Sequence, residues 1–452
     1  MESPIGITVA IFISAMPLFC QKGTQGTLLT WLDLICYFLL MVSLSKSKKD
    51  NKEKPPKRVF VGMSGGVDSS VSAALLKEAG FEVIGVFIKV WSPDWLPCDW
   101  REERRDAMRC AAILEIPLLT LNLEKEYKEE VVDYMIREYK AGRVPNPDVM
   151  CNRTVKFGGF FKEAMNMGAD FVATGHYART RGVDGKSIDS ASSLSSSARM
   201  NAFIHSDGLR GRGVLAEDRG NQIKNSKVKY NLLAGVDGNK DQSYFLWTLK
   251  QEQLSKTLFP VGHFKKEEVR VVAEKFGLPT ATKKDSQGLC FLGKIDVKDF
   301  LKRYINVKSG KVLNEKGETV GVHDGAVLYA IGERHGFSIE NKKPDDAPYY
   351  IVGKDIKKNT LVVSNNKSFG KSAQKEIEIG DLNWIKGVSP LKNKKYSARI
   401  RYREELKNCK IKNISPKKAT IVFDEPEESV SFGQSLVLYD GDVCLGGGVI
   451  NK

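Results

Sequence analysis

Short apolar runs alternate with amphipathic, charged stretches in the chain after residue 57. The apolar runs are rich in valine, isoleucine and phenylalanine, and they cover residues 59–63, 81–90, 117–123 and 171–174. Stretches of helical composition lie between them, at residues 71–79, 101–114, 124–140 and 152–167. Strands that alternate with helices predict a parallel sheet with crossover connections. Such sheets bind ligands at the carboxyl ends of their strands, so we look for chemistry in the loops there.

The second half of the chain has a different pattern. Residues 371–452 alternate apolar and polar positions between many short turns, which is typical of a small β-barrel, and residues 296–370 have a mostly β pattern. The predicted fold class is therefore α/β, with three domains. A parallel-sheet domain covers residues 58–295, a small mostly β middle domain covers 296–370, and a C-terminal β-barrel covers 371–452.

The leader, residues 1–57, ends in a charged linker and leaves several interpretations open. Its apolar runs cover residues 5–19 and 28–44, and lysines follow the second run. The first run lacks a positive n-region, which argues against a secretory signal. The second is at the short limit of a membrane span, about 17–25 residues, and its lysines suit a positive-inside anchor. Translation from an upstream start, with Met41 as the true initiator, explains the same pattern, and organelle targeting stays open. We expect a cytoplasmic protein without a stable membrane partner.

A serine-rich stretch interrupts the first domain at about residues 181–229. Low hydrophobicity together with serine, glycine and arginine richness predicts a disordered insert. Contact of its arginines with RNA is the alternative interpretation.

Composition narrows the class of protein. Hydrophobic residues make up 42% and charged residues 28% of the 452 residues, which is globular composition. Eight cysteines in 452 residues are too sparse for a disulfide scaffold, and the absence of a Cys-x-x-Cys pair disfavours a zinc ribbon or a thioredoxin-type motif. The net charge of +15 is compatible with a polyanionic partner.

The first strand-end loop has the sequence Ser64-Gly65-Gly66-Val67-Asp68-Ser69-Ser70. Its glycines let backbone N–H groups approach an anion, and the following helix offers its N-terminus to the same anion. Asp68 would repel phosphate unless a cation lies between them, which implies Mg²⁺. No Gly-Lys-Ser/Thr is present, so the loop is not a Walker A loop. It resembles the pyrophosphate loop (PP-loop) of the ATP pyrophosphatases, which cleave ATP between its α and β phosphates and adenylate a substrate.

Two single cysteines lie in other loops of this domain. Cys151 follows the proline-containing segment 144–148 and precedes a predicted helix that carries Arg153 and Lys156. A helix N-terminus and nearby cations both favour the thiolate, which is the nucleophilic form. Cys290 lies in the loop 285–293, close to Gly288 and Gly293. Burial as a small hydrophobic residue is the alternative for both cysteines.

Five segments in order resemble the tRNA-specific 2-thiouridylase family: Ser64–Ser70, Asn146–Asn152, Gly175–Arg179, Lys240–Leu246 and Ser286–Gly293. The resemblance runs from about residue 58 to residue 452 and leaves out the serine-rich insert. A later segment, Tyr329–Gly336, departs from the family at two positions. Glu333 replaces a glutamine there and His335 replaces a lysine.

The resemblance implies ATP-dependent 2-thiolation of the wobble uridine of tRNA. In the family, adenylation with ATP and Mg²⁺ activates oxygen 2 of the base, and a cysteine persulfide then delivers sulfur to carbon 2. By this resemblance, Cys290 carries the persulfide, Cys151 resolves it as a disulfide, and Asp148 acts as acid or base. The implied ATP site comprises Gly62, Met63, Ser64, Gly65, Gly66, Val67, Asp68, Ser69, Ile88 and Gly175, with Asp68 as the Mg²⁺ ligand. The implied substrate contacts are Asn146, Pro147, Asp148, His176, Lys240, Asp241, Gln242, Arg401, Tyr402 and Gln434.

The implied partners are the anticodon arm of tRNA and a persulfide sulfur donor protein. Basic side chains in the last domain predict contacts with backbone phosphates: Lys392, Lys394, Lys395, Arg399, Arg401 and Arg403. A solvated face is the alternative for this stretch. Two other functions also stay open at this point. A PP-loop amide ligase or synthetase acting on a small metabolite would need no paired cysteines, and a membrane-tethered RNA-binding protein would keep only a relict loop.

Overall fold

The structure is a computed structural model that describes residues 55–95, 100–182, 229–285, 296–340, 347–366, 373–428 and 430–451. The chain divides into two units, 1–55 and 56–452, and the described sheets and helices all belong to the second. Residues 1–54, the centre of the serine-rich insert at 183–228 and Cys290 lie outside the described residues. Within the described ranges, no helix has the length and apolar character needed to cross a membrane.

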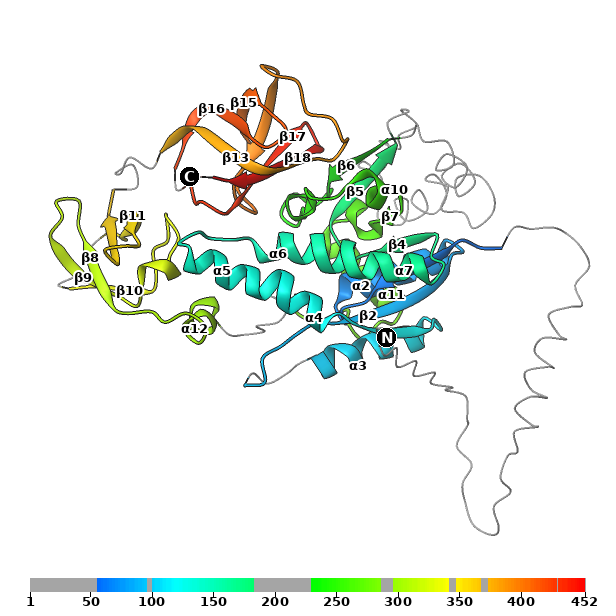
Figure 1. Ribbon diagram of the computed structural model, residues 1–452. Coiled ribbons are helices and arrows are strands. Elements are labelled where there is room, and N and C mark those ends of the chain that lie inside the picture. Colours follow the sequence, from blue (N-terminus) through cyan, green and yellow to red (C-terminus); the bar gives the residue numbers. More distant parts are fainter. Residues whose placement is uncertain are drawn as a thin grey trace, which may run out of the picture. The chain divides into compact units, whose positions relative to one another are not determined.

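A five-stranded parallel sheet forms the centre of the first domain (Figure 1). Its strands are β1 (Arg58–Gly62), β2 (Glu82–Lys89), β3 (Leu118–Asn122), β4 (Phe171–Ala173) and β7 (Thr257–Leu258). They lie in the order β3-β2-β1-β4-β7, and every pairing is parallel, which confirms the predicted sheet. The chain places β2 and β3 on one side of β1, and β4 and β7 on the other. The loops after β1 and β4 therefore meet at the switch point where such sheets bind ligands.

Helices pack on both faces of this sheet because successive strand residues point to opposite sides. Val59 and Val61 pack with α2 (Val67–Glu78), α3 (Trp100–Ile113) and α11 (Lys266–Lys275), whereas Phe60 packs on the other face. Two helical runs cover that other face: α4 (Glu124–Tyr127), η1 (Lys128–Asp133) and α5 (Tyr134–Lys140), then α6 (Pro147–Met150), η2 (Cys151–Phe160) and α7 (Phe161–Asn166). Shorter turns are η4 (Ser243–Leu246), α10 (Gln251–Ser255) and η5 (Pro260–His263).

The helical run that carries Cys151 begins earlier than the sequence predicts. Two prolines predict a start after residue 151, but α6 begins at Pro147. Proline is tolerated at the first helical position, where its missing N–H has no helical partner anyway. Asn146 caps the helix by accepting a hydrogen bond from the Val149 N–H at 3.2 Å. Cys151 therefore lies more than one turn inside the run, where the N-terminal dipole is weaker than expected.

The middle domain is built on a second five-stranded sheet. Its strands are β8 (Gly310–Leu313), β9 (Thr319–His323), β10 (Phe337–Ile339), β11 (Tyr350–Asp355) and β12 (Thr360–Ser364). The order is β10-β9-β8-β12-β11, with only the β8–β12 pair parallel among these strands. The helix α12 (Val297–Lys302) and the turn η6 (Ala326–Leu328) pack with it through Phe300, Leu301 and Leu328.

A closed antiparallel barrel forms the last domain, as the alternating pattern predicts. Its strands are β13 (Gln374–Trp384), β14 (Lys395–Arg399), β15 (Lys407–Ile414), β16 (Ala419–Glu427), β17 (Ser435–Asp440) and β18 (Val443–Ile450). The barrel closes because β13 pairs with both β16 and β18. A hairpin of the first domain, β5 (Ala178–Gly182) and β6 (Tyr230–Ala234), adds to β18 through Leu232 and Leu233. Arg181, assigned to the insert from sequence, thus belongs to β5.

Candidate active site

The segment 64–70 connects β1 to α2 and can cradle an anion. Gly65 has a φ of +72°, and a Cβ there would lie 2.2 Å from the Glu103 carbonyl oxygen, so only glycine fits. Gly66 is the N-cap of α2 and provides no side-chain cap, while the side chain of Val67 is buried in the core. The N–H groups of the first helical turn are thus left for a bound anion.

Of the three serines in this segment, one can bind a ligand and two form hydrogen bonds within the chain. Ser64 is exposed and can offer its hydroxyl to a phosphate. Ser69 is buried, accepts the Ser64 N–H at 3.2 Å and lies 3.3 Å from the Ser64 hydroxyl oxygen. Ser70 holds the loop itself, because its Oγ lies 2.9 Å from the Gly66 carbonyl oxygen and 2.8 Å from Thr280 Oγ1.

The remaining residues of the predicted nucleotide site are Gly62, Met63, Ile88 and Gly175, and they differ in what they contact. The Met63 side chain is buried in the core, so only its backbone can face a ligand. Gly62 lies beside Ile88, since a Cβ on Gly62 would be 4.0 Å from Ile88 Cδ1. Gly175 is required by packing inside the chain: a Cβ there would lie 2.7 Å from the Ser69 nitrogen. This close approach fixes the loop after β4 against the start of α2.

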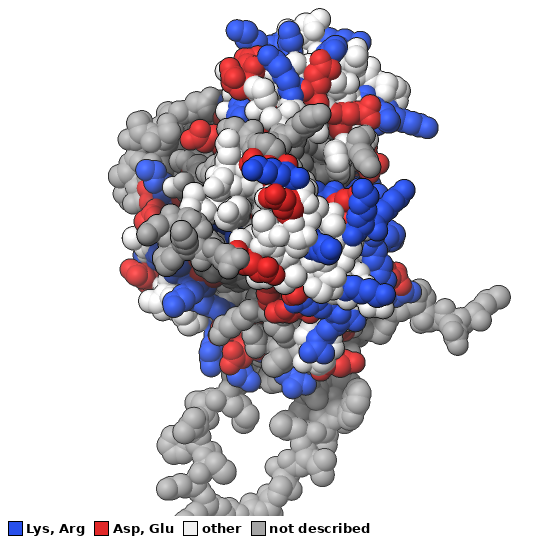
Figure 2. Space-filling view, turned by 90° about the vertical axis from the view of Figure 1, so that its left-hand side faces the viewer, with Lys and Arg blue, Asp and Glu red and all other residues white. Residues whose placement is uncertain are grey.

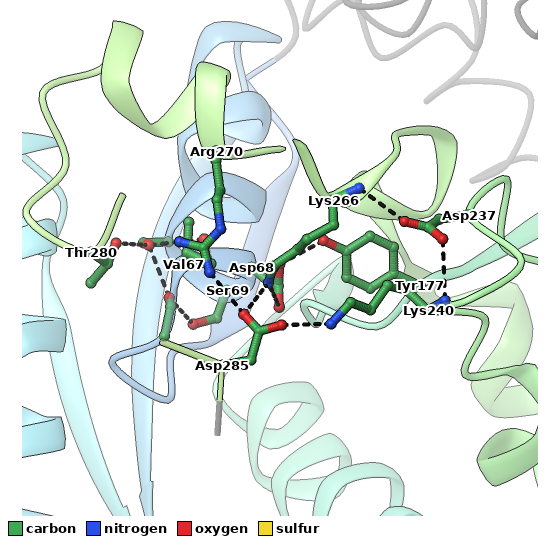
Figure 3. Close-up of polar contacts among 12 residues, drawn as sticks. Val67, Asp68, Ser69, Tyr177, Asp237, Lys240, Lys266, Arg270, Thr280 and Asp285 are labelled. Carbon is green, nitrogen blue, oxygen red and sulfur yellow. Dashed lines mark hydrogen bonds and ion pairs between the residues drawn. The ribbon is translucent and has the colours of Figure 1, made fainter. Parts of the chain in front are cut away.

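Asp68, the second residue of α2, already has partners (Figure 3). Its Oδ1 accepts hydrogen bonds from the Tyr177 hydroxyl at 2.7 Å and from Lys266 Nζ at 2.8 Å, and its Oδ2 lies 2.9 Å from the same Nζ. Burial, and next the Asp68 charge and hydrogen bond, raise the pKa of Tyr177, so its hydroxyl stays a donor. Lys266 begins α11, and its side chain is only 8% exposed.

Asp285 connects Lys266 to two further cations (Figure 3). Its Oδ1 lies 2.9 Å from Lys266 Nζ and 3.1 Å from Arg270 Nη2, and its Oδ2 accepts a hydrogen bond from Lys240 Nζ at 2.6 Å. Burial opposes the charged carboxylate, but the hydrogen bonds from Lys240 and Lys266 outweigh burial and lower the pKa of Asp285 to about 2. Asp285 is the last described residue before the segment that carries Cys290.

Asp148 and Cys151 are three residues apart on the helical run α6–η2, a spacing that places side chains on one helix face. Asp148 is exposed, whereas Cys151 is only 7% exposed and belongs to the apolar cluster with Phe60 and Phe160. The burial that the sequence left as an alternative is thus the observed position of Cys151. Its partner in the predicted exchange, Cys290, lies outside the described residues.

The barrel holds the loop that precedes Asp148. The Gln434 amide Nε2 donates hydrogen bonds to the Val144 carbonyl at 3.0 Å and the Pro145 carbonyl at 3.2 Å. Gln434 and Asn146 are both predicted substrate contacts, yet in this structure the Gln434 amide and the Asn146 oxygen bind backbone of the same chain. They position the loop, and Pro147 starts the helix.

Lys156 joins the helical run to the loop after β4. Its Nζ lies 3.3 Å from His176 Nε2, while His176 Nδ1 lies 2.8 Å from Thr174 Oγ1. Burial, and then the Lys156 charge, lower the pKa of His176 well below its usual value, so the ring is neutral and Nε2 accepts from the lysine. Partial desolvation raises the pKa of the Asp148 carboxyl, and the Lys156 charge opposes that rise.

Two of the predicted tRNA contacts, Asp241 and Gln242, have partners inside the chain. Asp241 is buried, and its Oδ2 lies 3.1 Å from Nη2 of Arg399, which was also predicted to meet phosphate. Gln242 Oε1 accepts the Tyr177 N–H at 3.0 Å and so positions Tyr177 beside Asp68. Lys240 donates a hydrogen bond to Asp285, which also contacts Lys266 and Arg270.

The last two predicted contacts lie where the domains meet. Arg401 Nη2 donates a hydrogen bond to the Ile331 carbonyl of the middle domain at 2.8 Å. The Tyr402 ring lies 4.5 Å from the Phe245 ring, between centroids. Both residues are half-buried, so each retains surface that a partner can reach.

The side chains beside the PP-loop fit a Mg²⁺ ion that binds together with a nucleotide. Within the ranges that the structure describes, no group of three or more His, Cys, Asp or Glu side chains could hold a metal alone. Mg²⁺ typically uses one or two carboxylates and completes its shell with water and substrate phosphates. Asp68 offers such a carboxylate at the helix N-terminus that would receive the phosphates.

Sequence reasoning assigned no role to Tyr177, Lys266 or Arg270. Tyr177 directly follows the predicted site residue His176, and this position in the sequence was the one indication that it belongs to the site. Lys266 lies between Lys265 and Glu267 in a charged stretch that looks like a solvated helix face. Its contact with Asp68 spans 198 positions, which no local pattern reveals.

Three family models match the chain in order. The tRNA methyl transferase HUP domain matches residues 57–201 and 211–294, the tRNA methyl transferase PRC-barrel domain matches 298–365, and the Aminomethyltransferase beta-barrel domain matches 374–450. These ranges coincide with the parallel-sheet domain, the middle sheet and the closed barrel.

Curated proteins match most of the chain. It is 41% identical over 396 residues to the tRNA-specific 2-thiouridylase MnmA of Nitrosomonas eutropha. The aligned residues cover 87% of this chain and 98% of that protein. It is 40% identical over 404 residues to the protein of the same name from Geobacillus thermodenitrificans, with 89% and 96% covered. Among solved structures, the U34-tRNA thiolase NcsA from Methanococcus maripaludis matches at 16% identity and a TM-score of 0.29, over 60% of this chain and 72% of that one. A likeness that weak supports no argument.

Proposed function

The chain belongs to the tRNA-specific 2-thiouridylase family and is an enzyme that 2-thiolates the wobble uridine of tRNA, and we propose that it does so by adenylating the base and transferring sulfur from a cysteine persulfide. The observation that carries the mechanism is the meeting of two groups at the switch point of the sheet. The PP-loop with Asp68 follows β1. His176 follows β4, and its Nε2 lies 3.3 Å from Nζ of Lys156 on the helical run that also carries Asp148 and Cys151.

The first half of the proposed reaction takes place at the PP-loop. Oxygen 2 of the uridine attacks the α phosphate of ATP, the bond to the β phosphate breaks, and pyrophosphate leaves. Mg²⁺ would neutralise the phosphates when bound, and Asp68 would hold it. The open first turn of α2 and the Ser64 hydroxyl bind phosphate oxygens. The Asp148 carboxylate accepts the proton that the base loses at N3.

The second half uses the two cysteines. The terminal sulfur of a Cys290 persulfide attacks carbon 2, AMP leaves, and the base is held through a disulfide to Cys290. The Cys151 thiolate then attacks the Cys290 sulfur, which releases 2-thiouridine and leaves a Cys151–Cys290 disulfide. A reductant regenerates both thiols, and a sulfur donor protein reloads the persulfide.

Basic side chains outside the PP-loop support a tRNA surface. Figure 2 shows lysine and arginine side chains gathered along one edge of the face that it draws. In the barrel, Lys392, Lys395 and Arg403 are exposed and can meet backbone phosphates. The target base must leave the anticodon stack to reach the PP-loop, as in other enzymes that modify bases.

Peptide mapping after one turnover without reductant tests the mechanism. We expect a Cys151–Cys290 disulfide to form in step with 2-thiouridine, because resolution of the persulfide oxidises both thiols. Cys151→Ala should stall with tRNA bound covalently to Cys290. Full activity of Cys151→Ala would contradict the exchange step and leave Cys151 as a packing residue. An amide ligase needs neither thiol, so the same experiment separates that alternative.

Replacing Lys156 with methionine should change the pH dependence of thiolation. The Lys156 charge opposes the rise in the pKa of Asp148, so its loss raises that pKa further. If the Asp148 carboxylate acts as the base, the acid limb of the pH–rate profile moves to higher pH. Lys156→Arg should keep the limb in place, and Lys162→Met, an exposed lysine six residues further along, is the matched control. An unshifted limb in Lys156→Met would exclude this coupling.

Removing residues 1–44 should leave the purified enzyme active. The first strand of the sheet starts at Arg58, and every described residue of the candidate site lies in the unit 56–452. The kcat/KM for tRNA thiolation of the truncated and full chains should agree. An insoluble or inactive truncated protein would show that the leader takes part in folding.

A further inference from the structure

Lys266 is a buried lysine that the mechanism above does not use. Its side chain is 8% exposed, and its Nζ lies within 2.9 Å of both Asp68 and Asp285. A buried ammonium is costly without partners, and here two carboxylates provide them. One of the two, Asp68, is the residue proposed to bind Mg²⁺ when the nucleotide arrives. Binding of Mg²⁺ would therefore leave part of the Lys266 charge to be neutralised by another anion.

Charge around Lys266 is arranged to receive such an anion. Lys240, Lys266 and Arg270 all converge on Asp285, and Lys266 also pairs with Asp68 (Figure 3). A third carboxylate, Asp237, accepts hydrogen bonds from the backbone N–H groups of Lys240 and Lys266, so three cations face three carboxylates. A Mg²⁺ ion adds two positive charges, which suits a ligand with the three to four negative charges of pyrophosphate. A second, independent feature also favours an anion here. The helix α2 begins beside Asp68 without a side-chain cap, so its first N–H groups can donate to the same anion.

We propose that Lys240, Lys266 and Arg270 form the subsite for the leaving pyrophosphate, and that Lys266 exchanges Asp68 for its oxygens when Mg²⁺ takes the Asp68 carboxylate. The inference rests on the proposed adenylation and assigns it a catalytic residue. As the bond between the α and β phosphates breaks, its electron pair passes to the pyrophosphate oxygen. Lys266, whose side chain is 8% exposed, donates a hydrogen bond to that developing charge.

Phosphate oxygens can replace the carboxylates without loss of hydrogen bonds. Both groups are fork-shaped acceptors, and the Arg270 guanidinium and the lysine ammonium groups donate to either. The Tyr177 hydroxyl stays on Asp68 Oδ1 and keeps that side chain in reach of the metal. Lys266 thus has anionic partners before the nucleotide binds and again afterwards.

Binding of pyrophosphate to the free enzyme, without tRNA, tests the subsite by calorimetry. Lys266→Met should weaken the binding of Mg²⁺–pyrophosphate at least tenfold, about the effect of one charge-assisted contact. Lys266→Arg should restore most of the affinity. Lys265→Met, the same change at the exposed neighbouring lysine, should bind as the wild type does. Wild-type affinity in Lys266→Met overturns the proposal.

Asp68→Asn gives a second test that does not depend on how well Lys266→Met folds. Without Mg²⁺, Asp68 competes with pyrophosphate for Lys266, so Asp68→Asn should bind metal-free pyrophosphate more tightly than the wild type. With Mg²⁺ the order should reverse, because the variant lacks the metal ligand. A merely structural ion pair gives no such reversal, and its absence overturns the exchange.

The outcome also separates this inference from the proposed function. Thiolation of tRNA by the wild-type enzyme is measured in parallel with pyrophosphate binding. Normal thiolation without the reversal refutes the exchange and leaves the function standing. The reversal without any thiolated tRNA supports the subsite and refutes the function.

Discussion

A Cys290→Ser enzyme is expected to form no detectable 2-thiouridine while it still adenylates tRNA. A serine oxygen cannot carry the terminal sulfur of a persulfide, so transfer to carbon 2 should fall on the order of 10³-fold or more. Adenylation should persist because the PP-loop and the Lys266 cluster contain no cysteine.

Two assays on the same variant separate these effects. Nucleoside analysis of the product tRNA measures 2-thiouridine, and release of pyrophosphate in the presence of tRNA measures adenylation. Cys409→Ser, which removes a buried thiol in β15 of the barrel, is the control for loss of a cysteine as such. Normal 2-thiouridine from Cys290→Ser would end its assignment as the sulfur carrier. Loss of adenylation as well would show that the segment after Asp285 also serves the nucleotide.

Asp68→Asn should strongly reduce both adenylation and thiolation. The amide keeps the size of the side chain and can still bond to Tyr177 and Lys266, but it lacks the charge that holds Mg²⁺ beside the phosphates. We expect kcat/KM for adenylation to fall by about 10²–10³-fold, the range seen when a key electrostatic contact of a transition state is lost. Thiolation should fall equally, because sulfur cannot displace an oxygen that is not activated.

A matched variant and a stability measurement support the interpretation of Asp68→Asn. Tyr177→Phe removes the hydrogen bond to the Asp68 carboxylate but keeps the carboxylate itself, so it should cost about 1.5 kcal/mol, or roughly tenfold in rate, less than the loss of the carboxylate. Asp285 remains beside Lys266, so Asp68→Asn should unfold at nearly the wild-type temperature. Unchanged pyrophosphate release from a folded Asp68→Asn protein would give Asp68 another role.

Local patterns in the sequence determined the elements and the approximate place of the site. Apolar runs of strand length between helical stretches specify a parallel sheet, because burial on both faces requires uninterrupted apolar residues. The glycine pair at 65–66 predicts an anion-binding loop, since only glycine tolerates the positive φ and the close approach of Glu103 at position 65. The start of the helix before Cys151 was misplaced because proline stops a helix in its interior but suits its first turn.

The tertiary structure alone decided which polar groups meet. Lys266 meets Asp68 across 198 positions, Arg399 meets Asp241 across 158, and Gln434 meets the Val144 carbonyl across 290. A charged residue has the same local sequence signature whether it is solvated or buried against an opposite charge. Its role depends on which elements pack together, and that packing is set by the apolar faces of many residues at once. The sequence therefore determined that a PP-loop exists and that Cys151 precedes a helical stretch, and the packing of sheet and barrel decided which side chains surround the PP-loop and Cys151.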